Sequence, residues 1–107
     1  MKFHRITFTI DVKKAGEAIL SELLDRHWIA CAQISRIESH YHWKGEREQT
    51  PEWKFELKTT LSGSPCVTQF ILEKHSYDVP EILCEEVESV NPDFSQWLCD
   101  ECGGLPS

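Results

Sequence analysis

The first thirty residues show two different spacings of apolar side chains. Apolar and polar residues alternate at first, and a period of two with β-branched and aromatic residues is typical of a half-buried strand. The apolar members of this segment are Ile6, Phe8, Ile10 and Val12. The spacing then becomes three or four residues, at Ala15, Ile19, Leu20, Leu23, Leu24 and His27 or Trp28. That period predicts an amphipathic helix, for which Asp11 is a suitable N-cap residue.

The pattern of residues 29–61 predicts a long hairpin. Its first half has apolar residues at even positions and then at odd positions, namely Ala30, Ala32 and Ile34, followed by Ile37, Tyr41 and Trp43. A β-bulge produces such a change of parity, so we expect a bulge near Ser35 and Arg36. We place the turn at residues 44–51. The second half alternates regularly and predicts a strand with one apolar face, made of Trp53, Phe55, Leu57, Thr59 and Leu61.

Two helices and one strand complete the pattern. Ser64 followed by Pro65 is a start signal for a helix that continues to Lys74. Residues 75–80 are a connection, and residues 81–90 predict a strand. Asn91 and Pro92 repeat the start signal for a last helix, whose apolar face carries Phe94, Trp97 and Leu98. Two glycines at 103–104 end this helix, and we expect residues 105–107 to be frayed.

The predicted order is strand, helix, strand, strand, helix, strand and a final helix. This order predicts an α+β, ferredoxin-like βαββαβ fold with one antiparallel sheet, two helices on one of its faces and an extra C-terminal helix. We expect a single domain over residues 1–102 and a short tail over residues 103–107. The hairpin carries more aromatic residues than two short helices can cover, which favours an oligomer.

Composition and charge narrow the function further. The chain has 107 residues and a net charge of −7, which disfavours general nucleic-acid binding. It has no apolar segment long enough to span a bilayer and no secretory signal, so we expect a cytoplasmic protein with neither a nucleic-acid nor a membrane partner. Every Lys and Arg lies at or before Lys74, and eight acidic residues follow it. This segment is either a solvated acidic surface or one that attracts cations or a partner.

Five segments carry recognisable motifs in a fixed order. They are Trp28–Ile34 (WIACAQI), Tyr41–Glu46 (YHWKGE), Leu57–Thr59 (LKT), His75–Ile82 (HSYDVPEI) and Phe94–Leu98 (FSQWL). Together they resemble the CutA divalent-cation tolerance family over nearly the whole chain. The resemblance implies a ferredoxin-like subunit and a tight homotrimer in which edge strands of the subunits pair. It also implies a role in divalent-cation tolerance, since some members bind copper or other divalent ions.

The chain departs from the family pattern at two places. Ser76 stands where the family usually has proline, and the segment Phe8–Asp11 lacks the cysteine implicated in some members as a copper ligand. Copper binding of that kind is therefore not expected. The fold also resembles trimeric PII-type signalling proteins by analogy. This leaves an alternative function, a trimeric module that binds a small ligand or partner between subunits.

Several residues are candidates for holding a divalent metal such as Cu, Zn or Ni, although we expect no metal to be needed for folding. His75 lies at the end of the second predicted helix, beside Glu73, where it is either an imidazole ligand or a charge at a helix C-terminus. Glu81 is a further candidate ligand. Cys99 and Cys102 have C-x-x-C spacing, which is either half of a soft metal site or structural. An H-x-H pair on the hairpin, His40 and His42, is either a ligand pair or an exposed polar face.

A second set of residues is assigned through the family resemblance to a ligand-binding cleft between subunits. Its members are Cys31, Tyr41, Trp43, Lys58, Tyr77 and Trp97. Lys58 and Glu81 have the alternative role of a salt bridge across the trimer interface, and the pattern also allows Cys31 and Cys84 to be core residues. The chain contains no Ser-His-Asp order, phosphate-binding loop or zinc-protease motif, so we predict that it is not an enzyme.

Overall fold

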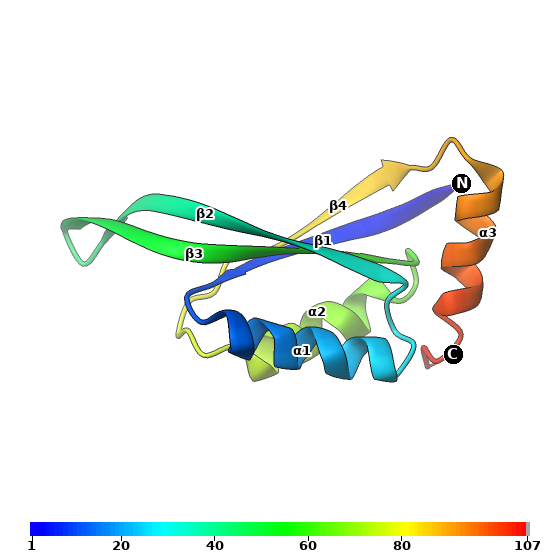
Figure 1. Cartoon of the computed structure of the whole chain (residues 1–107), viewed down its shortest axis with the longest axis horizontal. Helices are drawn as coiled ribbons and strands as arrows, with labels where there is room; N and C mark the ends of the chain where they lie inside the picture. The colour runs from blue at the N-terminus through cyan, green and yellow to red at the C-terminus, as the bar shows by residue number, and fades with distance from the viewer. Residues whose placement is uncertain (107) are drawn as a thin grey trace.

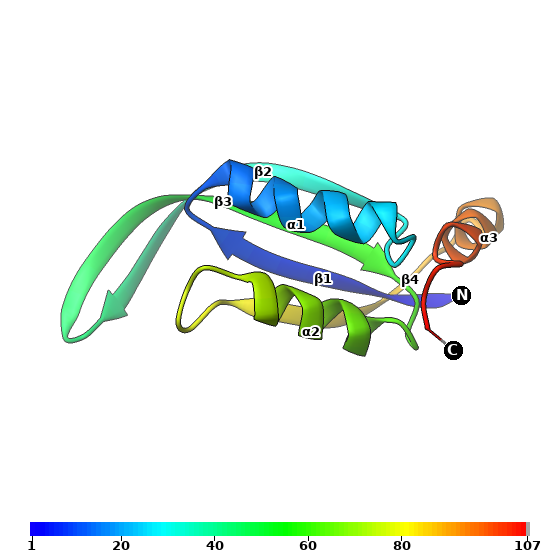
Figure 2. The same cartoon turned by 90° about the horizontal axis from the view of Figure 1, so that it is seen from below.

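The elements follow the predicted order in a computed structural model that describes residues 1–106. They are β1 (Lys2–Ile10), α1 (Lys13–Asp25), β2 (Cys31–Trp43), β3 (Glu46–Thr59), α2 (Ser64–Lys74), β4 (Ile82–Glu88) and α3 (Pro92–Glu101). The strands form one antiparallel sheet in the order β2-β3-β1-β4. Helices α1 and α2 cover one face of this sheet, and α3 lies at its end, far from the hairpin tip (Figures 1 and 2). The predicted α+β arrangement is confirmed.

The main core lies between the sheet and the two covering helices. Phe8 and Phe55 face each other across β1 and β3, fully buried, with parallel rings whose centroids are 4.8 Å apart. A methyl group added at Gly16 of α1 would come within 2.3 Å of the Phe55 ring. The glycine therefore lets α1 approach the sheet closely. The other buried apolar members of this core are Ile6, Ile10, Ile19, Leu23, Ile29, Leu57, Val67, Phe70 and Ile71.

Helix α3 closes the opposite end of the sheet over a second, smaller core. Asn91 caps the helix as predicted, because its side-chain oxygen accepts a hydrogen bond from the Asp93 N–H at 3.0 Å. The buried members of the second core are Phe3, Ala30, Leu98 and Cys102. Leu105 packs against both cores, so the predicted fraying is wrong at this residue. Ser107 lies outside the described residues.

The predicted bulge near Ser35 and Arg36 is wrong. Pairing of β2 with β3 continues without a break from Cys31 opposite Lys58 to Trp43 opposite Glu46. The apolar residues change face because the two halves of β2 have different neighbours. Near its start, Ala32 packs against the main core, whereas Tyr41 and Trp43 face the segment between α2 and β4.

The hairpin turn is also shorter than predicted. It consists of Lys44 and Gly45, both with positive φ, and β3 already begins at Glu46. Pro51 lies opposite Glu38 of β2 in the outer part of β3, beyond Trp53, where β1 no longer pairs with β3. Proline in a sheet is found at such edge positions. The outer hairpin is consequently a two-stranded ribbon that projects beyond the sheet and curves (Figure 2).

Three other local predictions need correction. Val12, not Asp11, occupies the N-cap position of α1, without a capping side chain. Helix α2 begins one residue earlier than predicted, so Ser64 is inside the helix and its hydroxyl lies 2.7 Å from His4 Nδ1. Cys84 is exposed, because β4 is an edge strand whose residues the helices barely cover. No helix among residues 1–106 is long and apolar enough to span a membrane.

Candidate functional site

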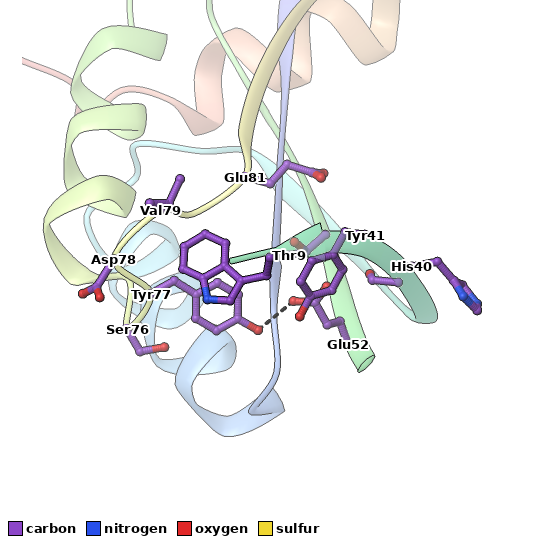
Figure 3. Close-up of a pocket in the computed structure, with 11 residues that line it drawn as sticks. Thr9, His40, Tyr41, Glu52, Ser76, Tyr77, Asp78, Val79 and Glu81 are labelled. Carbon is purple, nitrogen blue, oxygen red and sulfur yellow. Dashed lines mark hydrogen bonds between the residues drawn. The ribbon is translucent and has the colours of Figure 1, made fainter. Parts of the chain in front are cut away.

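A pocket of about 600 Å³ lies where the outer hairpin approaches the end of β1 and the segment between α2 and β4 (Figure 3). Five residues that the sequence pointed to line this pocket: Tyr41, Trp43, Tyr77, Glu81 and His40 of the H-x-H pair. The remaining lining residues are Thr9, Ser39, Glu52, Ser76, Asp78 and Val79. Tyr41 and Trp43 share one face of β2 because strand side chains alternate. The pocket is thus built from three segments that are distant in the sequence.

Glu52 is the pocket residue that sequence reasoning missed. Its side chain is only 6% exposed, and its Oε2 accepts a hydrogen bond from the Tyr77 hydroxyl at 2.7 Å (Figure 3). Within residues 1–106, the other carboxylate oxygen, Oε1, has no hydrogen-bond partner. Every side-chain oxygen or nitrogen that is fully buried in these residues has a partner, so Oε1 must be accessible to solvent. In the sequence Glu52 is one of several polar residues on β3. No local signal separates it from the others.

Burial raises the pKa of the Tyr77 phenol, and the hydrogen bond and negative charge of Glu52 raise it further. Asp11 and Tyr41 contribute in the same direction. Loss of the proton would place a second negative charge beside a buried carboxylate. Tyr77 is therefore held as a neutral hydrogen-bond donor.

His75 holds the Tyr77 segment in place. The Tyr77 backbone N–H donates to His75 Nδ1 at 3.0 Å, so the ring proton is on Nε2, which donates to the Thr9 carbonyl at 2.7 Å. The ring also packs edge-on against Phe8, with centroids 5.9 Å apart. A metal ion at either ring nitrogen would have to displace one of these hydrogen bonds. The side chain points towards β1, and we interpret its role as structural.

The lining of the pocket contains acidic residues but no Lys or Arg. The acidic residues are Glu52, Asp78 and Glu81, and none of the three carboxylates forms an ion pair within residues 1–106. His40, which also lines the pocket, has its Nε2 2.9 Å from Glu38 Oε1. The lining of the pocket consequently combines three acidic residues with three aromatic residues, and the Tyr77–Glu52 hydrogen bond joins one of each kind.

The other predicted cleft residues do not join this pocket within one chain. Cys31 and Lys58 are opposite each other on β2 and β3, near the α3 end of the sheet, and the Lys58 ammonium contacts the Gln33 side chain. Trp97 lies on α3 beside Phe94, with ring centroids 5.6 Å apart. Within one chain, Cys31, Lys58 and Trp97 therefore lie outside the pocket that Tyr41, Trp43 and Tyr77 line.

The two C-x-x-C cysteines have different surroundings. Cys102 is buried in the second core, 3.9 Å from Thr59 Oγ1, and burial raises the pKa of its thiol. Cys99 is partly exposed, with its Sγ 3.7 Å from Met1 Sδ. Within residues 1–106, no group of three or more His, Cys, Asp or Glu side chains is arranged to hold a metal ion.

The phenol of Tyr77 offers a direct test of the pocket geometry. The chain has two tyrosines, so a Tyr41→Phe variant keeps Tyr77 alone. Its tyrosinate absorbance should appear at a pH well above about 10, the ordinary pKa of tyrosine. Since the unfolded chain releases this proton near pH 10 and the folded chain keeps it, the free energy of unfolding falls as the pH rises above about 10. Adding Glu52→Gln should lower the pKa, whereas Glu48→Gln, outside the pocket, should leave it unchanged. An ordinary titration of Tyr77 would contradict the Glu52 contact.

The sequence of this chain is similar to a known protein family over most of its length. Residues 5–101 match the family described as CutA1 divalent ion tolerance protein. A probable divalent-cation tolerance protein CutA homologue of Encephalitozoon cuniculi is 30% identical over 105 residues, covering 95% of this chain and 92% of the relative. The divalent-cation tolerance protein CutA of Pyrococcus horikoshii is 34% identical over 88 residues, covering 82% and 86%.

Solved structures agree with the sequence comparison. The crystal structure of CutA1 from Ehrlichia chaffeensis superimposes with a TM-score of 0.88 at 32% identity, and 94% of each chain is covered. CutA1 from Pyrococcus horikoshii gives a TM-score of 0.87 at 32% identity, over 92% of this chain and 96% of that one. Sequence motifs, topology and three-dimensional similarity all agree, and this chain therefore belongs to the CutA1 divalent ion tolerance protein family.

Proposed function

We propose that the protein acts as a homotrimer in divalent-cation tolerance, through weak binding of divalent ions such as copper. The observation that carries this proposal is the set of three carboxylates without ion-pair partners at one pocket, Glu52, Asp78 and Glu81. Family membership supports the connection to divalent cations. Because the sequence lacks the catalytic motifs named above, we propose binding rather than catalysis as the activity.

The proposed binding is weak for a chemical reason. Carboxylate oxygens suit many divalent ions but select poorly for copper, which prefers imidazole and sulfur ligands. Residues 1–106 contain no preformed group of three ligands, so a complete coordination sphere needs water or a second subunit. His75 is already hydrogen-bonded at both ring nitrogens. The candidate ligands are therefore Glu81, which lines the pocket together with Glu52 and Asp78, and, at the other end of the sheet, Cys99 with Cys102.

Trimer assembly is supported by the hairpin. Beyond Trp53 the ribbon has no third strand, and an isolated two-stranded hairpin is marginally stable in water. Leu83 on the opposite edge strand is 56% exposed, and such apolar edges favour pairing with another copy. A trimer would also carry three times the net charge of −7, which attracts cations to its surface.

One experiment tests assembly and binding on the same sample. Light scattering should give three times the chain mass of 12.4 kDa, and calorimetric titration with Cu²⁺, Zn²⁺ and Ni²⁺ should show weak binding. Glu81→Gln should weaken this binding by about fivefold or more, since a lost charged ligand costs on the order of 1 kcal/mol at an open site. A monomer at micromolar concentration would contradict the proposed assembly.

Two variants serve as controls for the titration. Glu85→Gln removes a carboxylate that is already paired with Arg5 at 2.8 Å, so it should leave metal binding unchanged. The double variant Cys99→Ser/Cys102→Ser tests the rival ligand set. If this double variant abolishes binding while Glu81→Gln does not, the carboxylate pocket is not the metal site.

A second candidate function is a PII-like trimeric module that binds a small ligand or partner. The observation that favours it is the size of the pocket, because about 600 Å³ is much more than a metal ion needs and lies within the range of small-molecule sites. Tyr41, Trp43 and Tyr77 give this pocket an aromatic lining, which binding of a metal ion would not require.

A further inference from the structure

We propose that the pocket binds an organic ammonium cation, an inference that rests on the second candidate function and names the class of its ligand. Three aromatic residues, Tyr41, Trp43 and Tyr77, and three acidic residues line one pocket that no Lys or Arg lines. Figure 3 shows the Tyr77 hydroxyl pointing to Glu52 at this pocket. Aromatic faces and carboxylates share one preference, which is for positive charge. Together they exclude anionic ligands and favour a cation with an apolar surface.

The first argument comes from the buried carboxylate. Glu52 is 6% exposed, and a buried negative charge is costly unless hydrogen bonds or a counter-charge compensate it. Tyr77 supplies one hydrogen bond to Oε2, but Oε1 has no partner within residues 1–106 and is reached from outside. A cation in the pocket would compensate this charge. Asp78 and Glu81 add two further unpaired carboxylates around the same space.

The second argument comes from the aromatic rings. Trp43 and Tyr41 are each 43% exposed, although large aromatic side chains gain most from burial. The ammonium of Lys44 lies 5.9 Å from the centroid of the Trp43 ring, so this ring already attracts a cation of the same chain. An alkylammonium ion is stabilised by contact with such rings because its charge is spread over weakly hydrated apolar groups. A small metal dication is strongly hydrated, so contact with the rings stabilises it much less.

The third argument is the size of the pocket. A volume of about 600 Å³ suits a ligand with several non-hydrogen atoms. Tyr77 keeps its proton and is held by His75, so its ring and hydroxyl are fixed before any ligand arrives. A preformed wall of this kind reduces the entropy lost on binding.

The test compares choline with 3,3-dimethylbutan-1-ol, in which a carbon replaces the charged nitrogen. Titrations of isotope-labelled full-length protein by NMR should shift the indole N–H signal of Trp43. The indole signal of Trp97, which is 42% exposed on α3, should not move and serves as an internal control. We expect choline to bind about fivefold to thirtyfold more tightly than the neutral alcohol, since cation–π contacts contribute roughly 1–2 kcal/mol.

Matched variants separate the two parts of the site. Trp43→Leu should weaken choline binding about tenfold, whereas Trp97→Leu should not change it. Glu52→Gln should also weaken choline binding, while its amide oxygen can still accept the Tyr77 hydroxyl. Equal affinity for the neutral alcohol, a shift at Trp97 alone, or no saturable shift at Trp43 would each overturn the proposal.

The outcome also distinguishes this inference from divalent-cation binding. Trp43→Leu removes the aromatic face but no metal ligand, so we expect it to leave the affinity for Cu²⁺ unchanged. If Cu²⁺ binds and choline does not, the organic-cation inference fails and the metal proposal stands. If a basic side chain of a second copy fills the pocket in the assembled protein, choline will produce no shift at Trp43, and the inference is equally overturned.

Discussion

Replacing Phe55 with alanine should lower the free energy of unfolding by about 3–5 kcal/mol. The ring is fully buried and stacks on Phe8, and it also fills the space where α1 approaches the sheet at Gly16. Removing it takes away apolar contacts on both sides and leaves a cavity that rigid strands cannot collapse. Because a domain of this size has a total stability of about 5–15 kcal/mol, the loss is a large part of the whole.

Urea unfolding followed by tryptophan fluorescence measures this loss. All variants should be compared at one protein concentration, because the proposed trimer would make stability depend on concentration. Leu72→Ala is the matched control, because Leu72 lies on α2 with its side chain more than half exposed and should change stability by less than about 0.5 kcal/mol. A loss below about 1 kcal/mol for Phe55→Ala would mean that this ring is not central to the core.

Replacing His75 with alanine should lower the free energy of unfolding by about 2–4 kcal/mol, the second largest effect that we expect. The substitution leaves the buried Thr9 carbonyl without its donor and the Tyr77 N–H without its acceptor. It also removes a ring that packs against Phe8. Part of the loss is thus a cavity and part is unsatisfied hydrogen-bonding capacity.

The same variant separates the structural role of His75 from a metal role. The expected result is a large loss of stability without metal present, together with a lower pKa for the Tyr77 phenol, whose segment is no longer held against Glu52. His40→Ala is the control for the stability measurement alone, since His40 is exposed and its only side-chain hydrogen bond within residues 1–106 joins it to Glu38. Unchanged stability combined with lost Cu²⁺ binding would instead make His75 a metal ligand.

Local sequence signals predicted most of the sheet and helices for a clear physical reason. The alternation in β1 and β3 and the three-to-four spacing in α1 record which face of each element is buried, and burial is the dominant favourable term in folding. The Asn91–Pro92 start of α3 was also predictable, because capping involves neighbouring residues only. At the hairpin the same reasoning failed, since a bulge and a change of neighbour produce the same change of parity.

The candidate site was predicted only in part. The family motifs pointed to Tyr41, Trp43, Tyr77 and Glu81, and the structure brings these four to one pocket. Their grouping with Cys31, Lys58 and Trp97 does not occur within one chain. The sequence did not predict that Glu52 is buried in the pocket, because Glu52 continues the ordinary polar alternation of β3.

The sequence by itself determined the order of elements, the two faces of β1 and β3, the net negative charge and the family. Only the tertiary structure decided that Thr9, Glu52, His75 and Tyr77 are linked by hydrogen bonds, and that an aromatic, acidic pocket forms beside them. The physical reason is the range of the interactions. Periodicity and capping involve residues a few positions apart, whereas the pocket depends on how the hairpin curves and on where the segment after α2 crosses β1.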